Sequence, residues 1–524
     1  MKKSDLIAPE WYNITSEFEK YAADEERKAI ILEEENGDTK EITYRNLIKN
    51  ANKVGNILLK QGLKYGDKLL IMLPRCIEAY ELYIAALKTG IIIIPSSEML
   101  RTKDLQYRIT HGEIKGVVAT PAVIDEFKGV VEYEQLTKFI VGSELADWTS
   151  IDKEKEQASD QLETVKTKRD DVAFLSYTSG TTGNPKAVIH THGWGFAHMS
   201  SAPRYWLGIQ DGDTVWATAA PGWQKWVWSP FLSVMGTGAT AFVYEGKFDA
   251  AKYLELLEKY QVNVLCCTPT EYRLMAKLSN LDDYHLDALH SAVSAGEPLN
   301  REVIDKFKHH FNITVRDGYG QTESTLLLGF LKGTEVRPGA MGKPTPGNEV
   351  VIIDEDGQQL KPGEVGDIAI PLDTPALFRG YYKDEERTMK THRGDYYVTG
   401  DQAKMDEDGY FWFEGRSDDI IISSGYTIGP FEIEDTLVKH PDVKECAVVA
   451  SPDPIRGHVV KAFIILQANI IGDDEVVKKL QNYVKQQIAP YKYPRKIEFI
   501  SELPKTNSGK IRRVELRQRE HKNL

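Results

Sequence analysis

The stretch YTSGTTGNPK, residues 177–186, gathers small hydrogen-bond donors and one cation into ten positions. A strand that runs into a glycine-rich loop exposes backbone N–H groups, which can surround phosphate oxygens. The glycines permit close approach of the backbone, the hydroxyl side chains add donors, and the lysine adds a positive charge. The residues that we expect to bind a phosphate-rich ligand are Thr178, Ser179, Gly180, Thr181, Thr182, Gly183 and Lys186.

This stretch does not have the spacing of a P-loop, because Asn184 and Pro185 separate Gly183 from Lys186. A glycine-rich turn by itself is more often only a turn. Ten consecutive residues of this composition are more specific, and they favour an anionic ligand.

Three other patterns favour structural interpretations. GYGQTES begins like a dinucleotide fingerprint, but Glu323 occupies the position of the third glycine. DEDGYFWFE lacks ligands at the first and twelfth positions of a calcium loop, and it predicts a hairpin that turns at Asp408-Gly409. His190 and His192 have no acidic or cysteine neighbours in the sequence, so we interpret them as structural residues rather than metal ligands.

The elements around the loop alternate between helix and strand. Residues 45–62 and 76–90 have helical spacing of apolar residues, whereas residues 67–74 and 91–95 read as buried strands. Residues 171–177 form a further apolar strand that leads directly into the loop. This alternation predicts α/β units around a largely parallel sheet.

The 524 residues exceed the roughly 250–300 at which a single core stops growing, so more than one domain is expected. We predict an α/β protein with a large N-terminal domain at 1–415, a hinge at 416–419 and a small mobile C-terminal α/β domain at 420–524. Residues 349–370 predict a β-rich subdomain of the large domain, and the polar residues 147–170 predict a surface excursion.

Composition and charge limit the classes of binding partner and the cellular location that we expect. A net charge of −13 makes nucleic acid an unfavourable general partner. Residues 485–524 hold 11 Lys and Arg against 4 Glu, either a solvated basic face or a site for a phosphate-rich ligand. No apolar run is long enough to span a bilayer, the first residues lack a secretory signal, and four cysteines without C-x-x-C spacing favour a reducing cytoplasm.

Five motifs follow one another between Tyr177 and Arg513: YTSGTTGNPK, SAGEPL, GYGQTES, TGDQAKMDEDGYFWFEGRSDDIIISSGY and PKTNSGKIRR. Together they resemble the core motifs of the acyl-adenylate-forming enzymes, which include acyl-CoA synthetases, adenylation domains of peptide synthetases and firefly luciferase. SSGYTIGPFEIEDTL, SPDPIRGHVVKAFI and APYKYPRKIEFISELPKT look most similar to medium-chain and branched-chain acyl-CoA synthetases.

The resemblance implies two steps with ATP, Mg²⁺ and coenzyme A. A carboxylate attacks the α-phosphate of ATP and releases pyrophosphate, and the thiol of coenzyme A then displaces AMP. The catalytic residues implied are Thr322 as the α-phosphate contact, Glu323 as the Mg²⁺ ligand and Lys510 as the adenylation lysine, with Lys505 as a surface alternative. The further ATP-site residues implied, beyond the loop, are Gly296, Glu297, Pro298, Asp317, Gly318, Tyr319, Gly320, Gln321, Asp401 and Arg416.

In similar enzymes the small domain turns on a hinge, here Asp418, between adenylation and thioester formation. The residues that the resemblance places along coenzyme A are Ser424, Gly425, Tyr426, Arg456 and Lys492. Thr427 stands where close relatives have arginine, which leaves a phosphate contact from that position open. Acetylation of Lys510 by a lysine acetyltransferase, reversed by a deacetylase, would remove the charge needed for adenylation.

The acyl pocket is predicted from three positions. Acetate-specific relatives carry tryptophan where Gly320 stands here, so the pocket should extend beyond acetate. If residues 221–230 are helical, Trp223 and Trp226 share a face and shorten the pocket, although ordinary core packing is the alternative. We therefore expect isobutyrate, 2-methylbutyrate or butyrate ahead of octanoate.

Three alternatives to the acid–CoA ligase remain. A stand-alone adenylation enzyme would load a carrier protein, but no carrier segment or attachment motif is seen up to Leu524. A luciferase-like oxidase is disfavoured because no motif indicates oxygen chemistry. A non-catalytic nucleotide sensor would be expected to have lost Lys510 or Glu323, and both are present.

Overall fold

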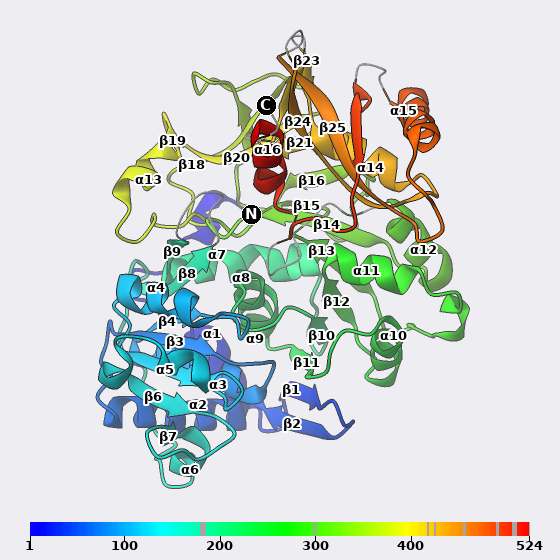
Figure 1. The fold of residues 1–524 in the computed structure, drawn as a ribbon. Helices are drawn as coiled ribbons and strands as arrows, with labels where there is room; N and C mark the ends of the chain where they lie inside the picture. The colour runs from blue at the N-terminus through cyan, green and yellow to red at the C-terminus, as the bar shows by residue number, and fades with distance from the viewer. Residues whose placement is uncertain are drawn as a thin grey trace. The chain divides into compact units, whose positions relative to one another are not determined.

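The computed structural model describes residues 1–178, 185–296, 299, 301–416, 419–423, 426–453, 457–488, 492–505 and 511–522 (Figure 1). The chain forms two compact units. The first comprises Met1–Glu349 and Pro371–Lys390, and the second comprises Val350–Ile370 and Thr391–Leu524. The hinge at 416–419 falls inside the second unit and stays a prediction.

A seven-stranded sheet in the first unit carries the glycine-rich loop. Its strands run in the order β7-β6-β5-β3-β4-β8-β9, and all neighbours are parallel except β8 and β9. The bounds are β3 (Lys68–Met72), β4 (Ile92–Pro95), β5 (Gly116–Ala119), β6 (Thr137–Ile140), β7 (Thr149–Ser150), β8 (Val172–Thr178) and β9 (Lys186–Thr191). Helices α2 (Tyr44–Lys60) and α3 (Ile77–Thr89) alternate with these strands, which confirms the predicted α/β units.

The second sheet of this unit runs in the order β16-β15-β14-β13-β12-β10-β11-β1-β2. The neighbours from β14 through β13, β12, β10 and β11 to β1 are parallel. The pairs β1–β2, β14–β15 and β15–β16 are antiparallel. The bounds are β1 (Lys28–Glu33), β2 (Thr39–Thr43), β10 (Thr214–Ala217), β11 (Thr240–Tyr244), β12 (Val264–Cys267), β13 (Ser291–Ala295), β14 (Val315–Gly320), β15 (Leu326–Gly329) and β16 (Ala340–Pro344).

Further helices of this unit connect and cover these strands. They are α1 (Ser16–Glu19), α4 (Thr102–Gly112), α5 (Ile124–Lys128), α6 (Ile151–Lys155), α7 (His192–Ala202), α8 (Gln224–Trp226), α9 (Val234–Thr237), α10 (Ala250–Lys259), α11 (Pro269–Ala276), α12 (Arg301–Phe311) and α13 (Glu385–Lys390). Two π-helical segments, η4 (Pro203–Leu207) and η5 (Val227–Ser233), follow α7 and α8. Short 3₁₀ turns lie at Lys3–Leu6, Lys20–Ala23, Tyr133–Gln135 and Leu281–Asp283.

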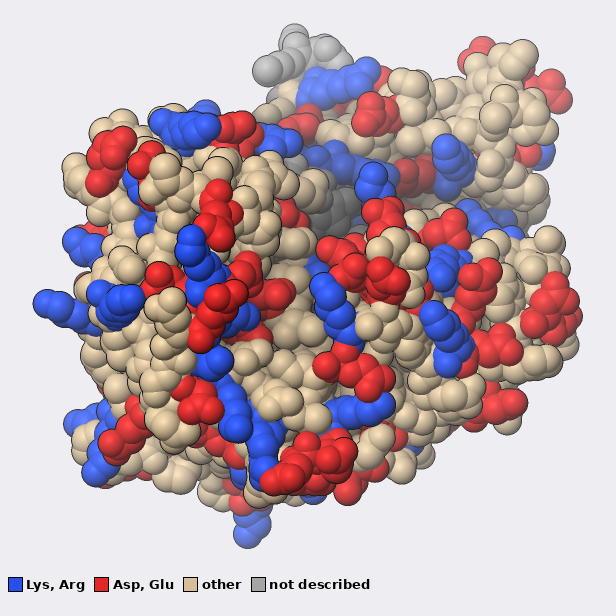
Figure 2. Space-filling view, turned by 90° about the horizontal axis from the view of Figure 1, so that it is seen from below, with Lys and Arg blue, Asp and Glu red and all other residues tan. Residues whose placement is uncertain are grey.

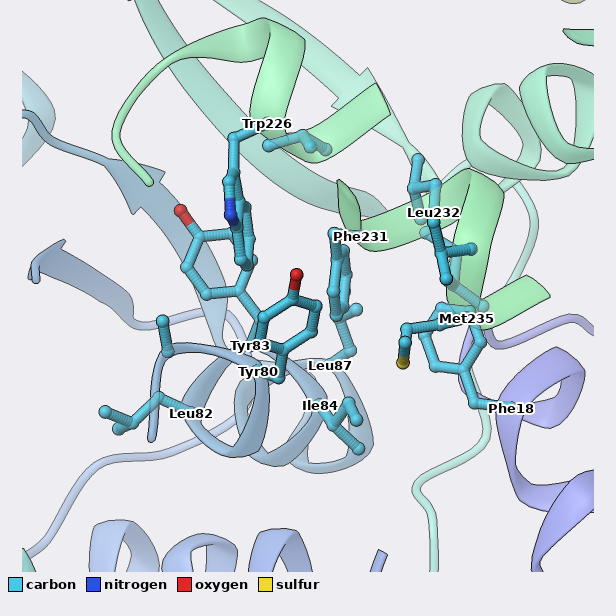
Figure 3. Packing of buried hydrophobic residues seen from close by; sticks show 14 of the residues in the cluster. Phe18, Tyr80, Leu82, Tyr83, Ile84, Leu87, Trp226, Phe231, Leu232 and Met235 are labelled. Atoms are coloured by element: carbon cyan, nitrogen blue, oxygen red, sulfur yellow. The ribbon is translucent and has the colours of Figure 1, made fainter. Parts of the chain in front are cut away.

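The largest core cluster combines α2 and α3 with side chains from both sheets and from η5. Figure 3 shows Trp226 and Phe231 packing onto Tyr80 and Tyr83 of α3, with stacked Trp226 and Phe231 rings 5.5 Å apart. The prediction of a surface excursion at 147–170 is wrong for its first part. Residues 148–155 include β7 and α6, and they bury Trp148 and Ile151 because both side chains pack into cores of this unit.

The second unit begins with a β-rich part. Strands β17 (Val351–Ile353), β18 (Val365–Pro371), β20 (Tyr396–Met405) and β21 (Phe411–Arg416) pair in this order, and β19 (His392–Arg393) pairs with β20. The antiparallel β20–β21 hairpin with Gly409 at φ +81° confirms the turn predicted at Asp408-Gly409.

The remainder of the second unit is the predicted small α/β domain. Its sheet has the order β23-β22-β25-β24, with β26 parallel to β25. The bounds are β22 (Ile421–Ser423), β23 (Tyr426–Ile428), β24 (Val443–Asp453), β25 (Gly457–Leu466), β26 (Lys496–Phe499), α14 (Pro430–Val438), α15 (Asp474–Gln487) and α16 (Arg513–Lys522). The core of this domain is formed by side chains of β22, β24, β25, α14 and α15.

Acidic and basic side chains are interspersed over the molecular face drawn in Figure 2. Within the described part of the chain, each helix is too short or too polar to span a bilayer.

Candidate active site

The β8–β9 hairpin holds both ends of the glycine-rich loop. Thr178 and Lys186 face each other as the last pair of the antiparallel ladder, and Tyr177 pairs with Ala187 before them. Ser179, Gly180, Thr181, Thr182 and Gly183 lie outside the described residues. The hydroxyl of Thr178 is buried and has no hydrogen-bond partner among the described residues, so an acceptor or donor from a ligand fits there.

Lys186 forms a tight group with Glu323 and Tyr381. Its Nζ lies 2.5 Å from Oε1 of Glu323 and 2.9 Å from the hydroxyl oxygen of Tyr381. The Tyr381 hydroxyl donates to the same Glu323 oxygen at 2.8 Å, and the ammonium lies 4.6 Å from the centre of the Tyr381 ring. Two residues predicted for phosphate and Mg²⁺ are thus brought together from distant parts of the sequence.

Glu323 is only 5% exposed, yet its surroundings favour the ionised carboxylate. Burial opposes the charge, but attraction to Lys186 and hydrogen bonds from Lys186 and Tyr381 outweigh it and lower the pKa of Glu323. Mg²⁺ prefers anionic oxygen ligands, so this buried carboxylate suits the metal that the resemblance implies.

Three elements hold the turn that carries Thr322 and Glu323. His190 donates from Nε2 to the Thr322 carbonyl at 2.6 Å, and Trp194 donates from Nε1 to the Ser324 carbonyl at 3.2 Å. The backbone N–H of Phe378 donates to the Glu323 carbonyl at 2.8 Å. Burial lowers the pKa of His190 to about 4, so the ring is neutral and serves as a backbone-positioning group.

The adenine-side residues lie where two parallel strands end. Ala295 of β13 pairs with Gly318 of β14, which places Gly296 and Asp317 at the same edge of the sheet. The carboxylate of Asp317 accepts from the N–H groups of Leu299 and Gly318, at 3.2 and 2.9 Å. Burial nevertheless raises the pKa of Asp317 to about 7. Glu297 and Pro298 lie outside the described residues.

Lys225 is a residue of this region that the sequence analysis missed. Its Nζ donates to the Ala295 carbonyl at 2.8 Å, at the end of β13. Its neighbour Gln224 accepts a 2.6 Å hydrogen bond from Ser176 of β8, two residues before Thr178. The α8 segment therefore bridges the strand that leads into the loop and the strand that leads to Gly296. A lysine inside the aromatic stretch WQKWVW was the available signal.

Gly320 has a structural reason to be glycine. A Cβ at this position would lie 2.2 Å from the Thr325 carbonyl oxygen, because β14 turns tightly into β15. The smallness of this residue therefore does not by itself indicate a large acyl pocket. Tyr319 pairs with Leu328 in the same hairpin, and Gln321 N–H donates to the Ser324 hydroxyl at 3.1 Å.

Trp223 and Trp226, the two tryptophans predicted for the acyl pocket, do not share a helix face. Trp223 precedes α8 as its N-cap residue, and only Gln224–Trp226 form α-helix before the π-helical η5. Trp226 is buried, and its ring lies 4.7 Å from that of Tyr83 and 5.0 Å from that of Tyr80 (Figure 3). Trp226 therefore packs in the core, which was the alternative to a pocket role in the sequence analysis. Trp223 is partly exposed.

In the second unit, the two residues predicted for the ribose face each other. Asp401 of β20 is registered opposite Arg416 of β21, and Arg416 Nε lies 3.9 Å from Asp401 Oδ1. Asp401 is buried and the Arg416 side chain is about half exposed. Asp418 lies outside the described residues.

The coenzyme A and adenylation residues are described only in part. Ser424, Gly425, Arg456 and Lys510 lie outside the described residues, as do the side chains of Tyr426 and Thr427. Lys492 forms an ion pair with Glu432, and the surface alternative Lys505 pairs with Glu445 at 2.7 Å. Lys505 and Ile511, the described residues on either side of 506–510, form an isolated antiparallel bridge.

Comparisons with known proteins place the chain in a family. The family model of the AMP-binding enzymes matches residues 18–382, and that of the AMP-binding enzyme C-terminal domain matches residues 432–510. The chain is 61% identical over 520 residues to the uncharacterized acyl–CoA ligase YtcI of Bacillus subtilis (strain 168), covering 99% of this chain and 98% of that protein. It is 41% identical over 495 residues to the mitochondrial acyl-coenzyme A synthetase ACSM3 of Mus musculus, covering 93% and 85%.

A solved structure shares the fold over the full length. The crystal structure of the anthranilate CoA ligase AuaEII in complex with anthranoyl-AMP has a TM-score of 0.89 and 27% identity, covering 100% of this chain and 99% of that one. The family models, the full-length relatives and this fold together show that the chain belongs to the AMP-binding enzymes, as an AMP-forming acyl-CoA synthetase that uses ATP, Mg²⁺ and coenzyme A.

Proposed function

We propose that this acyl-CoA synthetase activates short or branched carboxylic acids, with isobutyrate, 2-methylbutyrate and butyrate as lead substrates. The observation that supports this choice is the bridging position of α8. Bonds from Ser176 to Gln224 and from Lys225 to Ala295 hold this segment between the loop strand and the adenine-side strand. In our proposal the ring of Trp223, directly before α8, lines the acyl end of the site and shortens the space for an acyl chain.

The assignment of residues to the adenylation step rests on the Lys186–Glu323–Tyr381 group. In our proposal Lys186 turns to the phosphates of ATP and Glu323 binds Mg²⁺, so the two charges that neutralise each other in the free protein serve two partners in the complex. Mg²⁺ held by Glu323 would supply positive charge against the phosphates of ATP and of the leaving pyrophosphate. The Thr178 hydroxyl and the loop N–H groups orient the phosphates, and Thr322 contacts the α-phosphate. Lys510 stabilises the charge that develops on it.

The ribose and coenzyme A residues complete the proposal. Asp401 accepts hydrogen bonds from the ribose hydroxyls and Arg416 lies on its phosphate side. Ser424, Gly425 and Tyr426 line the path of the thiol, and Arg456 and Lys492 bind the nucleotide end of coenzyme A. Release of Lys492 from Glu432 would accompany that contact.

The proposal is tested with a panel of acids from acetate to octanoate, measured as ATP-dependent pyrophosphate release with and without coenzyme A. We expect the highest kcat/KM with four- and five-carbon acids and thioester formation only with coenzyme A. Discrimination should be modest, because each methylene contributes about 1–3 kcal/mol. Trp223→Ala should shift the preference toward longer acids, with Trp11→Ala, an exposed ring far from α8 in the sequence, as control.

Acetate or octanoate as the best substrate would overturn the substrate assignment. Adenylate formation that coenzyme A does not turn into thioester would instead favour the loading of a carrier protein. Gly320→Trp is unsuitable as a test, because a side chain there collides with the Thr325 backbone.

The proposal also covers the location of the protein and its regulation at Lys510. A reducing, cytoplasmic location fits the free thiols of Cys76, Cys266, Cys267 and Cys446. Acetylation of Lys510 would remove the charge used in adenylation and act as an off-switch, which mass spectrometry of the protein from its native cells would reveal.

A further inference from the structure

Tyr381 reaches the site from a segment that the sequence motifs did not include. Residues 379–382 run antiparallel to β9 and are joined to it by an isolated bridge and by backbone hydrogen bonds. Arg379 N–H donates to the Ile189 carbonyl at 3.0 Å and Ile189 N–H to the Gly380 carbonyl at 3.1 Å. Tyr381 pairs with Val188, so its side chain lies on the same face as Lys186 and His190. The residue is only 5% exposed.

The hydroxyl of Tyr381 has one proton and it is directed at Glu323. Because the carboxylate can only accept, the 2.8 Å contact is a bond from Tyr381 to Glu323 Oε1. The oxygen of the same hydroxyl accepts from Lys186 at 2.9 Å, while the ring lies beneath the ammonium. Tyr381 thus contacts both charged members of the site and is itself neutral.

We propose that Tyr381 is a positioning residue for adenylation. Its hydroxyl holds the Glu323 carboxylate in the orientation that binds Mg²⁺, and its ring face keeps Lys186 next to the phosphates. This inference rests on the proposed role of Glu323 as Mg²⁺ ligand.

The physical reason is the change of partners when ATP and Mg²⁺ bind. Glu323 then loses the ion pair with Lys186 and would be left with a freely rotating carboxylate. A neutral donor from a fixed strand keeps one oxygen in place without competing for the metal or adding charge. Groups that orient metal ligands in this way typically change metal affinity by about 10–100-fold when removed.

The decisive measurement is metal binding rather than activity. Mn²⁺ bound to the enzyme with a non-reactive methylene analogue of ATP is counted by electron paramagnetic resonance for wild type and Tyr381→Phe. We expect Mn²⁺ to bind about tenfold more weakly in the variant, with unchanged affinity for AMP, which needs no metal. The matched control is Tyr382→Phe, because this neighbouring hydroxyl donates to Glu113 at 2.8 Å.

Activity adds a second readout. The Mg²⁺ concentration for half-maximal pyrophosphate release should rise by a similar factor in Tyr381→Phe, and excess Mg²⁺ should restore most of the rate. A loss of rate that is the same at every Mg²⁺ concentration, or Mn²⁺ binding equal to wild type, would overturn the positioning role.

Glu323→Gln separates this inference from the proposal beneath it. If Glu323→Gln weakens Mn²⁺ binding and Tyr381→Phe does not, only the role of Tyr381 is wrong. If Glu323→Gln binds Mn²⁺ like wild type, the ligand assignment is wrong and the role of Tyr381 falls with it. If Tyr381 acts through Glu323, Tyr381→Phe should have no further effect on Mn²⁺ binding in the Glu323→Gln background.

A measurement on the intact side chain covers the case in which Tyr381→Phe does not fold. With 3-fluorotyrosine at position 381, the ¹⁹F resonance should shift when Mg²⁺ and the ATP analogue bind, because Lys186 turns from the hydroxyl to the phosphates and the Glu323 carboxylate that accepts from the hydroxyl binds the metal. The same label at position 382 should not shift. An unchanged resonance at 381 would contradict the proposal.

Discussion

At the scale of single residues, burial and neighbouring groups determine the pKa values of two carboxyl groups of the site, Asp317 and Glu323. Lys186 and Tyr381 offset the cost of burial at Glu323 and lower its pKa, whereas burial raises the pKa of Asp317 to about 7 although the backbone N–H groups of Leu299 and Gly318 donate to it. Two carboxyl groups, one on β14 and one on the turn that follows it, thus differ in the direction of their pKa shifts because of their partners.

Asp317 should make the stability of the protein depend on pH. Its pKa in the folded protein, about 7, exceeds the ordinary value near about 4, so between these values the folded state holds a proton that the unfolded state has lost. This contribution therefore falls as pH rises from about 4 to 7. Asp317→Asn cannot titrate, so its melting temperature relative to wild type should increase between pH 5 and pH 8.

Thermal unfolding monitored by circular dichroism across this range checks the prediction. Asp125→Asn, which changes an exposed carboxylate on α5, should give a curve parallel to wild type. If Asp317→Asn also runs parallel to wild type, the Asp317 carboxyl group does not titrate in this window.

At the scale of elements, tight backbone approach determines where side chains are tolerated. The β14–β15 hairpin carries the residues from Asp317 to Gly320 and bulges between Tyr319 and Gly320. The bulge brings the Thr325 carbonyl close to Gly320, and the same turn presents Thr322 and Glu323. The sharp turn that carries Thr322 and Glu323, the residues proposed for catalysis, is thus the reason that glycine is needed.

Gly320→Ala should destabilise the first unit by about 1–3 kcal/mol, the usual cost of forcing extra atoms into a packed site. The Cβ would stand 2.2 Å from backbone, which cannot rotate away as a side chain could. Urea unfolding of the two proteins measures the difference. Gly37→Ala gives a comparison for backbone strain alone, because φ there is +92° and the added Cβ enters open space. Equal stability of Gly320→Ala and wild type would show that the hairpin adjusts freely.

At the scale of the whole molecule, the residues that we propose for the reaction are divided between two units. The first carries Lys186, Thr322, Glu323 and Tyr381, and the second carries Asp401, Arg416 and the C-terminal domain. In the second unit, ion pairs of Arg513 with Glu434 and of Arg517 with Asp419 attach α16 to the domain. Lys510 directly precedes Ile511, which bridges to Lys505, and α16 follows in the sequence, so we expect Lys510 to move with this domain.

Lys510→Ala should therefore separate the two half-reactions. Adenylation should fall by about 10²–10³ or more, because a charge that stabilises the transition state is removed. Thioester formation from chemically prepared acyl-adenylate should persist, since similar enzymes present the opposite face of the domain in that step. Gly425→Leu should have the reverse effect by blocking the thiol, and Asp418→Pro should trap one orientation by restricting φ at the hinge.

Single-turnover rates of the two steps test this. An equal loss in both half-reactions for Lys510→Ala would indicate a structural role for the lysine and would remove the main support for alternation of the domain.

Much of the fold and part of the site could be predicted because their signals are local. The strand–loop–strand unit around Lys186, the α2–β3–α3–β4 alternation and the Asp408-Gly409 hairpin each depend on residues close together in the sequence. The burial of Trp148 was not predicted, because a polar segment conceals the few positions whose partners lie elsewhere.

The sequence by itself determined the chemistry of this protein: a donor-rich loop with one lysine, an ordered set of motifs, and an α/β frame to carry them. Only the tertiary structure decided how these charges are paired. Glu323 and Tyr381 stand 137 and 195 residues from Lys186, and Lys225 stands 70 residues from Ala295, so no local pattern could join them. This proximity sets the charge of Glu323, because a buried carboxylate stays ionised only where cationic or hydrogen-bonding partners lie next to it.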